Sequence, residues 1–486
     1  MIMYRSRLKN NLDNITLEYV SSLFDDAEIA FYDIAGSQAH VIMLYDKKII
    51  TKNEAKKILL ALEKLKKEKF EKKSDAEDIH ELIEQHVIKK IGIESGGKMH
   101  TARSRNDQVS LDIRMKIRDD INLLCHCILN TIQTLVSLAQ KHQKTVMPLY
   151  THLQQAQVGL FSHYLLSYAD ALFRDLDRLY VTYGRVNESS LGAGPVGGTS
   201  IPIDRQSTAK MLGFKGIVEN SIDATTTRDF VIEYVAAVAI LMTNLSRLAE
   251  DFVIWSTSEF GFIELPDEFT SPSSVMPQKK NPDILELTRG KTAQVIGNLT
   301  TILSIVKGLP SGYNRDLQQI KPSIWSSSRI AVTALVVIKS MLEKINVDNQ
   351  KMKKAIEGGY LVALDVAEKL VNNGIPFRTA HQIVGSIVKI AHNSKKPFEK
   401  LSIDEITKST KGIEPSLVKK IIESTSISSS LQNRISQGSS GISEQKRMIQ
   451  HRMKKLSMYR TGTTKRDNEV KTTFSNLTLK VKNLTK

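Results

Sequence analysis

Residues 230–255 read FVIEYVAAVAILMTNLSRLAEDFVIW, and this stretch decides the fold class. Small and branched apolar residues cover much of the circumference of the helix expected over Asp229–Glu259. A helix that is apolar on nearly all sides is buried on nearly all sides. At about 1.5 Å per residue it would be roughly 45 Å long, too long for one small globule to enclose. The stretch therefore predicts the centre of an elongated helical bundle.

Further long segments carry apolar residues at three- and four-residue spacing with almost no internal proline. They are Leu111–Gln143, Gln154–Val186, Asp283–Lys307 and Ser327–Ile345. Such bundles usually bury their apolar stripes against sister subunits, so we expect an all-α fold with an oligomeric core. We expect an N-terminal helical domain over 1–105, the long-helix bundle over 106–353, a C-terminal helical domain over 354–455 and a tail over 456–486.

The composition is that of an ordinary globular protein: 486 residues, of which 41% are hydrophobic and 25% charged. The chain has two cysteines, Cys125 and Cys127, which are too close in sequence to favour a disulfide and fit a reducing cytoplasm. Its opening, MIMYRSRLKN, lacks the apolar core of a signal peptide, and no charge-free run is long enough for a membrane span.

The net charge of +16 raises the question of an anionic partner. The basic residues are spread over Lys-rich segments such as Lys56–Lys73 and over the tail 456–486, which we expect to be flexible. A solvated surface explains this pattern better than nucleic-acid binding, although binding through the tail could coexist with another function. The alternation in Leu477–Val481 indicates a short strand or a docking segment.

Three motifs suggest chemistry that their details do not support. Gly92–Lys98 has the spacing of a phosphate-binding loop, but Met99 replaces the required hydroxyl. His80 and His86 resemble a zinc-protease helix, but the spacing of the two histidines is wrong. Cys125–Cys127 lies within an apolar helical pattern and reads as core. We therefore expect neither a metal nor a nucleotide cofactor.

Three polar clusters on predicted loops share one chemical theme. His100–Gln108 combines two arginines with hydroxyls and amides, a set that suits carboxylate binding. Thr151–Gln154 is expected to open a long helix with His152 near its amino end. Ser273–Pro282, SSVMPQKKNP, offers hydroxyls, amides and two lysines. Each cluster alone could be a structural cap or a salt-bridge cluster, but their joint presence on loops beside long helices favours a shared site.

These motifs carry a family resemblance. SSVMPQKKNPDILELTRGK (273–291) is similar to the signature of the aspartase/fumarase superfamily in its argininosuccinate lyase form, and HTARSRNDQV (100–109) is close to that family's HTGRSRNDQV. Further blocks that resemble the family are LYTHLQQAQ, NSIDATTTRDFVIE, GLPSGYNRDLQ and LVNNGIPFRTAHQIVG. The resemblance runs from about residue 20 to about residue 450.

The resemblance implies the family reaction, cleavage of L-argininosuccinate into L-arginine and fumarate, without metal or cofactor. Ser273 would remove the proton next to a carboxylate, and the dianion that forms needs positive charge and donors close by. Lys279 and Asn281 would bind that carboxylate. His152, oriented by Glu286, would protonate the departing nitrogen. The two proton-transfer roles of Ser273 and His152 are also assigned the other way round.

The same resemblance supplies the substrate-binding positions. They are Ser22, Arg103, Ser104, Asn106, Thr151, Asn281, Tyr313, Gln318 and Lys321. Because these residues are far apart in sequence, the resemblance implies a homotetramer whose active sites each draw on three subunits.

Three departures from the family pattern stand out. Pro272 replaces a glycine before the serine pair and lacks an N–H, so loop closure could differ. Ala102 replaces a glycine in the arginine-rich turn, which matters only if that position needs a positive φ. Val158 replaces a proline.

The alternatives to this function are another fumarate-releasing lyase of the superfamily, or a non-catalytic protein of the crystallin kind.

Overall fold

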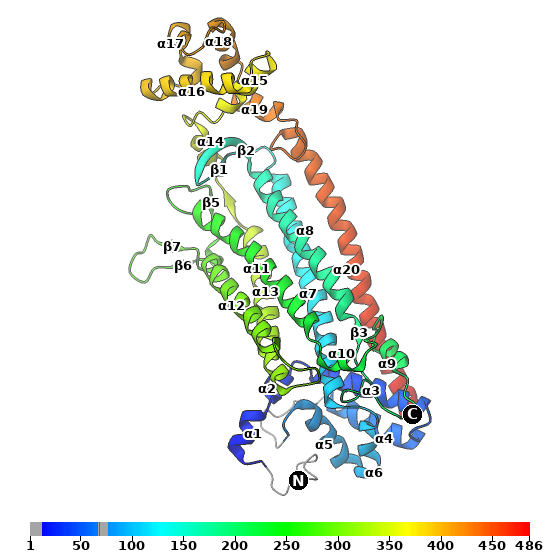
Figure 1. The fold of residues 1–486 in the computed structure, drawn as a ribbon. Coiled ribbons are helices and arrows are strands. Elements are labelled where there is room, and N and C mark those ends of the chain that lie inside the picture. The colour runs from blue at the N-terminus through cyan, green and yellow to red at the C-terminus, as the bar shows by residue number, and fades with distance from the viewer. Residues whose placement is uncertain (1–11, 67, 69–75) are drawn as a thin grey trace.

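The structure is a computed structural model that describes residues 12–66, 68 and 76–486. Five long helices lie side by side and form an elongated bundle (Figure 1). They are α7 (Arg105–Lys141), α8 (Phe161–Val186), α11 (Asp229–Trp255), α12 (Asp283–Val306) and α13 (Lys321–Leu342). The all-α prediction is confirmed, because the strands of the described chain form only short two-stranded pairs.

Short helices gather at the end of the bundle where the chain begins (Figure 1). They are α1 (Asn14–Val20), α2 (Leu23–Asp26), α3 (Ala30–Asp46), α4 (Lys52–Leu65), α5 (Ile79–Ile91), α6 (Ile93–Gly96) and η1 (Gly97–His100). At the same end lie α9 (Arg205–Met211), α10 (Ser221–Thr226) and η3 (Arg315–Ile320). The short helix η2 (Asp267–Phe269) comes before α12 in the sequence. The opening 1–11 and residues 67 and 69–73 of the Lys-rich segment are outside the described residues.

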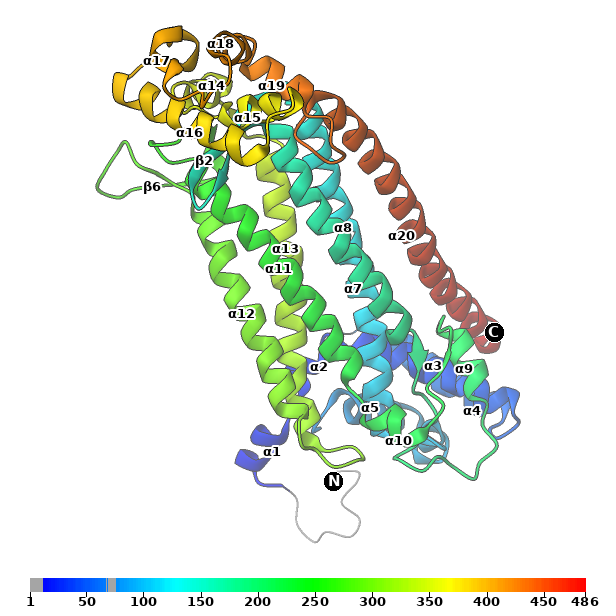
Figure 2. The same ribbon diagram turned by 45° about the horizontal axis from the view of Figure 1, so that its top comes forward.

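A second group of helices covers the opposite end of the bundle (Figure 2). It comprises α14 (Asn349–Ile356), α15 (Ala363–Asn372), α16 (Phe377–Ser394), η4 (Phe398–Lys400), α17 (Ile403–Thr407), α18 (Pro415–Glu423) and α19 (Ile427–Asn433). A separate apolar core over Val366–Ile422 holds most of this group together. We call it the C-terminal helical unit.

The strands connect the helices at loops. β1 (Val146–Thr151) pairs antiparallel with β2 (Gln154–Leu160), and β3 (Glu188–Ser189) pairs parallel with β4 (Gly216–Ile217). β5 (Ile263–Glu264) and β8 (Asn346–Val347) are antiparallel, as are β6 (Ser271–Pro272) and β7 (Lys280–Asn281). Two of these pairs, β1–β2 and β6–β7, carry the predicted catalytic residues.

The bundle is built by local capping and by burial. Ser104 caps α7 by accepting the Asn106 N–H, and Asp107 accepts the Ser104 N–H in return, so two otherwise unpaired donors at the helix start are satisfied. Within α11, Val235, Val238 and Leu241 are fully buried, whereas Ile240 is 41% exposed. The helix is therefore buried on most sides within one chain, and its exposed strip joins Ile240 to the polar residues Thr243, Arg247 and Glu250.

Three helical stretches are long and apolar enough to cross a membrane by length and composition alone: Arg105–Lys141, Asp229–Trp255 and Arg315–Leu342. Between 50% and 67% of the residues in their most apolar windows are buried inside the protein. Their hydropathy is thus used for packing within the bundle.

The helix expected to begin at Gln154 begins instead at Phe161, because residues 146–160 form the β1–β2 hairpin. Gln154 and Gln155 are exposed near the tip, whereas Val158, Gly159 and Leu160 are buried at the root, so the hairpin runs from the surface into the protein. His152 and Leu153 form the two-residue turn, with φ of +55° and +57°. Turns that match the twist of a hairpin need a positive φ at both central residues. His152 therefore lies at a hairpin tip and not at the amino end of a helix.

The tail is not a flexible segment. Residues 442–485 form one helix, α20 (Ile442–Thr485), which lies along α7 and α8 (Figure 2). Leu456, Thr463, Val470 and Leu477 are buried at seven-residue intervals, the spacing of a helix that follows its neighbours at a shallow angle. The expected boundary at 455 falls inside this helix, and Leu477–Val481 is a helical docking segment and not a strand.

The residues between those apolar positions explain why the sequence suggested a tail. Arg452 bonds Asp170 at 2.6 Å, and the Arg466 guanidinium lies 4.2 Å from the centre of the Tyr183 ring. Arg466 also donates to the sulfur of Cys125, which is buried in the core as predicted. A seam built from one apolar residue in seven and from arginines has little hydrophobic signal in the sequence.

Candidate active site

A pocket of about 290 Å³ lies at the end of the bundle where α7 begins. Five of the predicted substrate-binding residues line it: Ser22, Asn106, Tyr313, Gln318 and Lys321. They come from α2, α7, η3 and α13, which are far apart in sequence. The structure therefore brings together within one chain about half of the binding positions expected from the sequence.

The floor of the pocket is a buried ion pair. Lys321 is 2% exposed, and its ammonium group bonds the carboxylate of Asp26, which is fully buried. Asp26 also accepts hydrogen bonds from the Ser22 hydroxyl at 2.6 Å and from the Ile79 N–H at 3.3 Å. These bonds fix both the lysine and the serine in place, so the donors that face the pocket are held before a ligand arrives.

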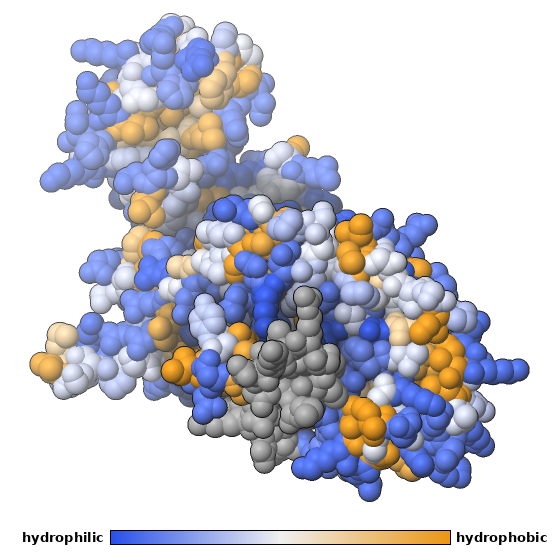
Figure 3. Space-filling view, turned by 60° about the horizontal axis from the view of Figure 1, so that its bottom comes forward, coloured by the Kyte–Doolittle hydropathy of each residue, from blue (hydrophilic) through white to orange (hydrophobic). Residues whose placement is uncertain are grey.

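Charges of both signs surround the pocket. Arg315 pairs with Glu77 at 2.7 Å, and Arg105 pairs with Asp78 at 2.8 Å. Burial alone would raise the pKa of Asp78, but His80 and Arg105 hold it below its usual value. Figure 3 views the molecule from this end, where hydrophilic side chains prevail and apolar patches lie between them. Such a mixture suits a ligand that carries both carboxylates and a cationic group.

Asn106 and Asp107 tie the pocket to a glycine-rich loop. The Asn106 amide donates to the carbonyl of Pro195 at 3.0 Å. Asp107 accepts the backbone N–H groups of Gly192 at 3.0 Å and Gly194 at 2.8 Å. Burial raises the pKa of Asp107 to about 6 although these donors and Ser104 act in the opposite direction. The loop is therefore fastened to the first turn of α7.

Arg103 and Ser104 lie beside the pocket and do not line it. Arg103 is 7% exposed and donates to the hydroxyl of Ser37 at 2.8 Å. Ser104 serves as the cap of α7. Ala102 has a φ of +58°, so this position does require the left-handed region that the family's glycine adopts without strain.

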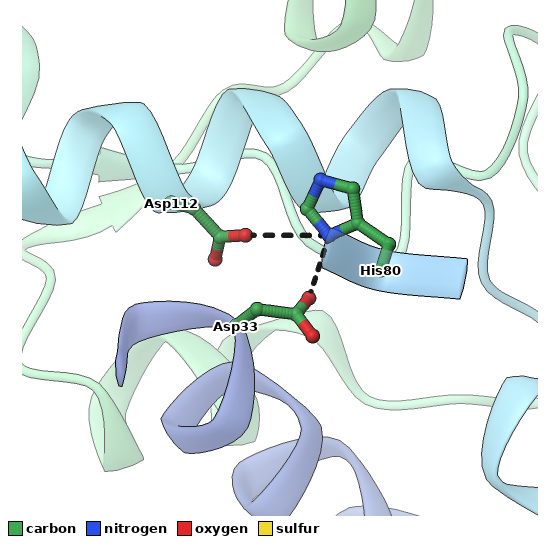
Figure 4. A group of neighbouring side chains, drawn as sticks. All are labelled: Asp33, His80 and Asp112. Carbon is green, nitrogen blue, oxygen red and sulfur yellow. Dashed lines mark hydrogen bonds and ion pairs between the residues drawn. The ribbon is translucent and has the colours of Figure 1, made fainter. Parts of the chain in front are cut away.

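Behind the pocket lies a buried group of three ionisable side chains, Asp33, His80 and Asp112 (Figure 4). The Nδ1 atom of His80 is 2.9 Å from Asp33 and 3.6 Å from Asp112. Burial lowers the pKa of His80, but the carboxylates of Asp33, Asp78 and Asp112 outweigh it and raise the pKa to about 9. These are ligand types that bind metals, but the charged imidazolium itself supplies the positive charge between the carboxylates.

The predicted catalytic residues lie away from this pocket, towards the other end of the bundle (Figure 1). Ser273 follows β6 on the loop that joins β6 to β7. Its hydroxyl oxygen accepts the backbone N–H groups of Val275 at 3.2 Å and Met276 at 3.0 Å. Two donors at one oxygen stabilise negative charge on it, which is what a serine base requires.

The rest of the loop is held by its strands and by ion pairs. Pro272 lies opposite Lys280 in the β6–β7 pair, and the Ser273 N–H donates to the Lys279 carbonyl at 3.3 Å. Lys280 pairs with Asp267 at 2.7 Å. Asn281, the second residue of β7, donates from its amide to the hydroxyl of Ser271 at 3.5 Å. Pro272 thus occupies a strand, and the backbone donor next to it comes from Ser273.

His152 and Thr151 lie at the exposed tip of the β1–β2 hairpin. Among the described residues, no hydrogen bond or ion pair joins His152 to Glu286 or Ser273 within the chain. Glu286 lies in the first turn of α12, where its half-exposed carboxylate is 3.9 Å from Arg289. One chain therefore carries two groups of predicted site residues, which we call half-sites: the pocket at one end, and the hairpin and loop with the predicted catalytic side chains towards the other.

Some residues of the pocket were not singled out as binding residues from the sequence. They are Asp26, Glu77, Asp78, His80, Arg105, Val109 and Arg315. Arg105 and Arg315 lie inside quoted motifs and could have been found there. Glu77, Asp78 and His80 precede or open α5, where the sequence EDIH offers a carboxylate–histidine signal.

Comparison with known proteins agrees with this geometry. A family model described as "Lyase" matches residues 6–297, and one described as "Argininosuccinate lyase C-terminal" matches residues 360–430. Argininosuccinate lyase from Nitrosopumilus maritimus is 67% identical over 98% of each chain. The enzyme of that name from Methanocaldococcus jannaschii is 41% identical over 87% of this chain and 88% of its own.

The fold has relatives among solved structures. A crystal structure of EDDS lyase in complex with formate superposes with a TM-score of 0.84 and 26% identity, covering 99% of this chain and 97% of the other. The long helical bundle is therefore an architecture shared with that enzyme, and the sequence relatives narrow the family further. The chain belongs to the argininosuccinate lyase family of the aspartase/fumarase superfamily.

Proposed function

We propose that this protein is a carbon–nitrogen lyase that cleaves L-argininosuccinate into L-arginine and fumarate, the last step of arginine biosynthesis. The observation that carries the proposal is the pocket that combines Ser22, Asn106, Tyr313, Gln318 and Lys321 with paired acidic and basic groups. The substrate has carboxylates and a guanidinium group, and both find partners of opposite charge there. Close similarity to proteins named argininosuccinate lyase supports the same reaction.

In the proposed reaction Ser273 removes the proton from the carbon next to a carboxylate. A serine alkoxide is unstable in water, and the N–H groups of Val275 and Met276 lower its energy. Lys279 and Asn281, on the same loop and strand, bind the carboxylate whose charge grows as the proton leaves. No metal ion or organic cofactor takes part in the proposed steps.

His152 gives a proton to the departing guanidinium nitrogen, and Glu286 orients the imidazole. Since the two residues do not bond within one chain, Glu286 would act on a His152 from another subunit. The reverse assignment makes His152 the base and Ser273 the acid. Exchange of the substrate's carbon-bound hydrogen with solvent separates the two, because only the variant that lacks the base loses that exchange.

We propose that the protein assembles as a homotetramer in which three subunits contribute to each active site. Two observations support this: the half-sites lie apart along one bundle, and apolar side chains remain exposed on its long helices. Leu287 on α12 is 58% exposed, Ile296 48% and Val336 on α13 49%. Monomeric proteins seldom leave aligned apolar residues of this kind in water.

We expect the assembly to act in the cytoplasm on a small-molecule substrate, without membrane or nucleic-acid partners. The binding of Arg466 to Asn122 within the fold removes part of the basic tail from the surface that nucleic acid could contact. The Lys-rich face that remains is explained as solvated surface.

The proposal is tested by incubating the purified protein with argininosuccinate and following fumarate by its ultraviolet absorbance. We expect fumarate and arginine in equal amounts. Parallel incubations with adenylosuccinate, aspartate and malate test the other lyases of the superfamily. Release of fumarate only from one of these would replace the proposed substrate, and release from none would favour a non-catalytic protein.

A further inference from the structure

The hairpin that carries His152 has one strong attachment outside its own strands, an arginine of the C-terminal helical unit. Arg434, which follows α19, donates from its guanidinium group to the carbonyl oxygen of Val158 on β2. β1 and β2 form a two-stranded ribbon, so outward-facing carbonyls on either strand lack a strand partner. Arg434 supplies the donor for one of them.

The same guanidinium group is bound on its other sides. It lies 3.3 Å from the carboxylate of Asp365 on α15, and it donates to the hydroxyls of Ser430 at 3.0 Å and Ser440 at 3.1 Å. Ser430 in turn donates to Asp365 at 2.7 Å. The side chains of Arg434 and Asp365 are only 12% and 9% exposed. We call these four residues the arginine anchor.

Apolar packing places the root of the hairpin against the same unit. Val158 and Leu160 form a small core with Ile356, Leu361 and Leu431. Towards the tip, the amide of Gln155 donates to the carbonyl of Ala355 at 2.9 Å. Residues 151–155 are otherwise exposed, so the direction of the turn that holds His152 depends on these attachments.

The turn itself cannot fix the direction in which His152 points. His152 and Leu153 both have positive φ, which costs a residue other than glycine of order 1 kcal/mol or more. A strained turn relaxes unless the structure around it prevents the relaxation. The hairpin also contains a register shift between Leu149 and Tyr150, which loosens the pairing between the tip and the root.

From this geometry we infer that Arg434 is a positioning residue for His152: the arginine anchor fixes the hairpin and thereby the place of the imidazole in the active site. The inference rests on the proposed function of His152. Arg434 touches neither substrate nor reacting atoms. Its effect is on the distance between the imidazole and the leaving nitrogen, where an error of about 1 Å can lower the rate about 100-fold.

The test compares Arg434→Gln with Arg447→Gln, a matched control whose arginine pairs with Glu444 on its own helix at 2.7 Å, away from the hairpin. We expect Arg434→Gln to lower kcat by about 10- to 100-fold with KM changed less than about threefold, because the substrate pocket is untouched. The control should retain wild-type kcat.

Added guanidinium ions should restore part of the activity of Arg434→Gly, since they can occupy the vacated position between Asp365 and Val158.

Hydrogen exchange of the intact protein gives a second readout that does not need activity. Amides of residues 149–160 should exchange faster in Arg434→Gln, whereas those of α2 and α5 around the pocket should not change. If Arg434→Gln fails to fold, Arg434→Lys and Asp365→Asn test the same anchor with smaller changes. A folded variant with wild-type kcat and unchanged hairpin exchange overturns the inference. An inactive wild type would instead overturn the proposed function, and the exchange comparison would still show whether Arg434 holds the hairpin.

Discussion

At the scale of single residues, the serine loop illustrates how backbone donors prepare a side chain for chemistry. The Ser273 hydroxyl lies between the N–H groups of Val275 and Met276 without any contact from a distant element. This arrangement is local, so a sequence motif can encode it completely. This locality explains why the loop could be identified from the sequence, although the other predicted site residues lie on distant elements.

Replacing Ser273 by alanine tests its role as base. We expect Ser273→Ala to lower kcat by about 10²- to 10⁴-fold with little change in KM, because the pocket proposed to bind the substrate lies at the other end of the bundle. Ser274→Ala, one residue along the same exposed loop, is the matched control and should stay active. Turnover of Ser273→Ala within about tenfold of wild type would remove Ser273 as the base.

His80 predicts a pH dependence of stability. Its pKa in the folded protein is raised to about 9, from 6.5 in the unfolded chain. The folded state therefore holds the proton more tightly, and the stability that this provides is present below pH 6.5 and is lost as pH rises through about 9. The loss should reach about 3 kcal/mol of unfolding free energy.

Denaturant unfolding between pH 6 and pH 10 measures this loss. The fall should be absent from His80→Gln, whose side chain does not titrate. His86→Gln, a partly exposed histidine of the same helix that lies 3.4 Å from Glu68, should behave as wild type. A wild-type stability that stays level across this range would contradict the assignment of a buried imidazolium.

At the scale of elements, α20 shows how a helix with little hydrophobic signal can still be part of the core. Its buried residues recur once every seven positions, and arginines that bond acidic or aromatic partners fill the positions between them. Residues 456–486 should therefore be needed for stability and not merely tolerated. The β1–β2 hairpin is a second case, since antiparallel pairing with β1 makes residues 154–160 a strand where glutamines and alanine allow a helix.

Two leucines of α20 provide a matched comparison. Leu477 is 2% exposed and Leu479 is 56% exposed. We expect Leu477→Ala to destabilise the protein by about 2–5 kcal/mol, because it leaves a cavity against the bundle, and Leu479→Ala to have little effect. Thermal unfolding followed by circular dichroism compares the two. Equal melting temperatures for both variants would mean that α20 does not dock as described.

At the scale of the whole molecule, the separation of the half-sites is the dominant fact. Helices α2 and α5, which contribute residues to the pocket, lie at one end of the bundle, and the β1–β2 hairpin, whose turn holds His152, lies towards the other (Figure 1). One chain cannot bring them together without breaking the bundle. An assembly in which the long helices of different subunits pack against one another can bring one half-site of each chain to the other half-site of a neighbour.

Mixed assemblies test this sharing. Asn106→Leu and His152→Asn should each lower activity strongly, because each removes one half-site from every subunit. When the two variants are unfolded together and refolded as a mixture, some sites combine two intact halves, and activity should rise about tenfold or more above either variant alone. A chain that carries both substitutions is the control and should remain inactive. If the mixture gains nothing, the sites are not shared between subunits.

The sequence by itself determined the all-α class, the long helices and the family, because helical periodicity and the loop motifs are local properties. It also predicted which residues would bear the chemistry. Only the tertiary structure decided where those residues lie. It showed that His152 caps a strained hairpin, that the tail is a docked helix, and that a charged histidine lies between carboxylates behind the pocket. Each of these depends on contacts between segments up to hundreds of residues apart, which no local pattern records.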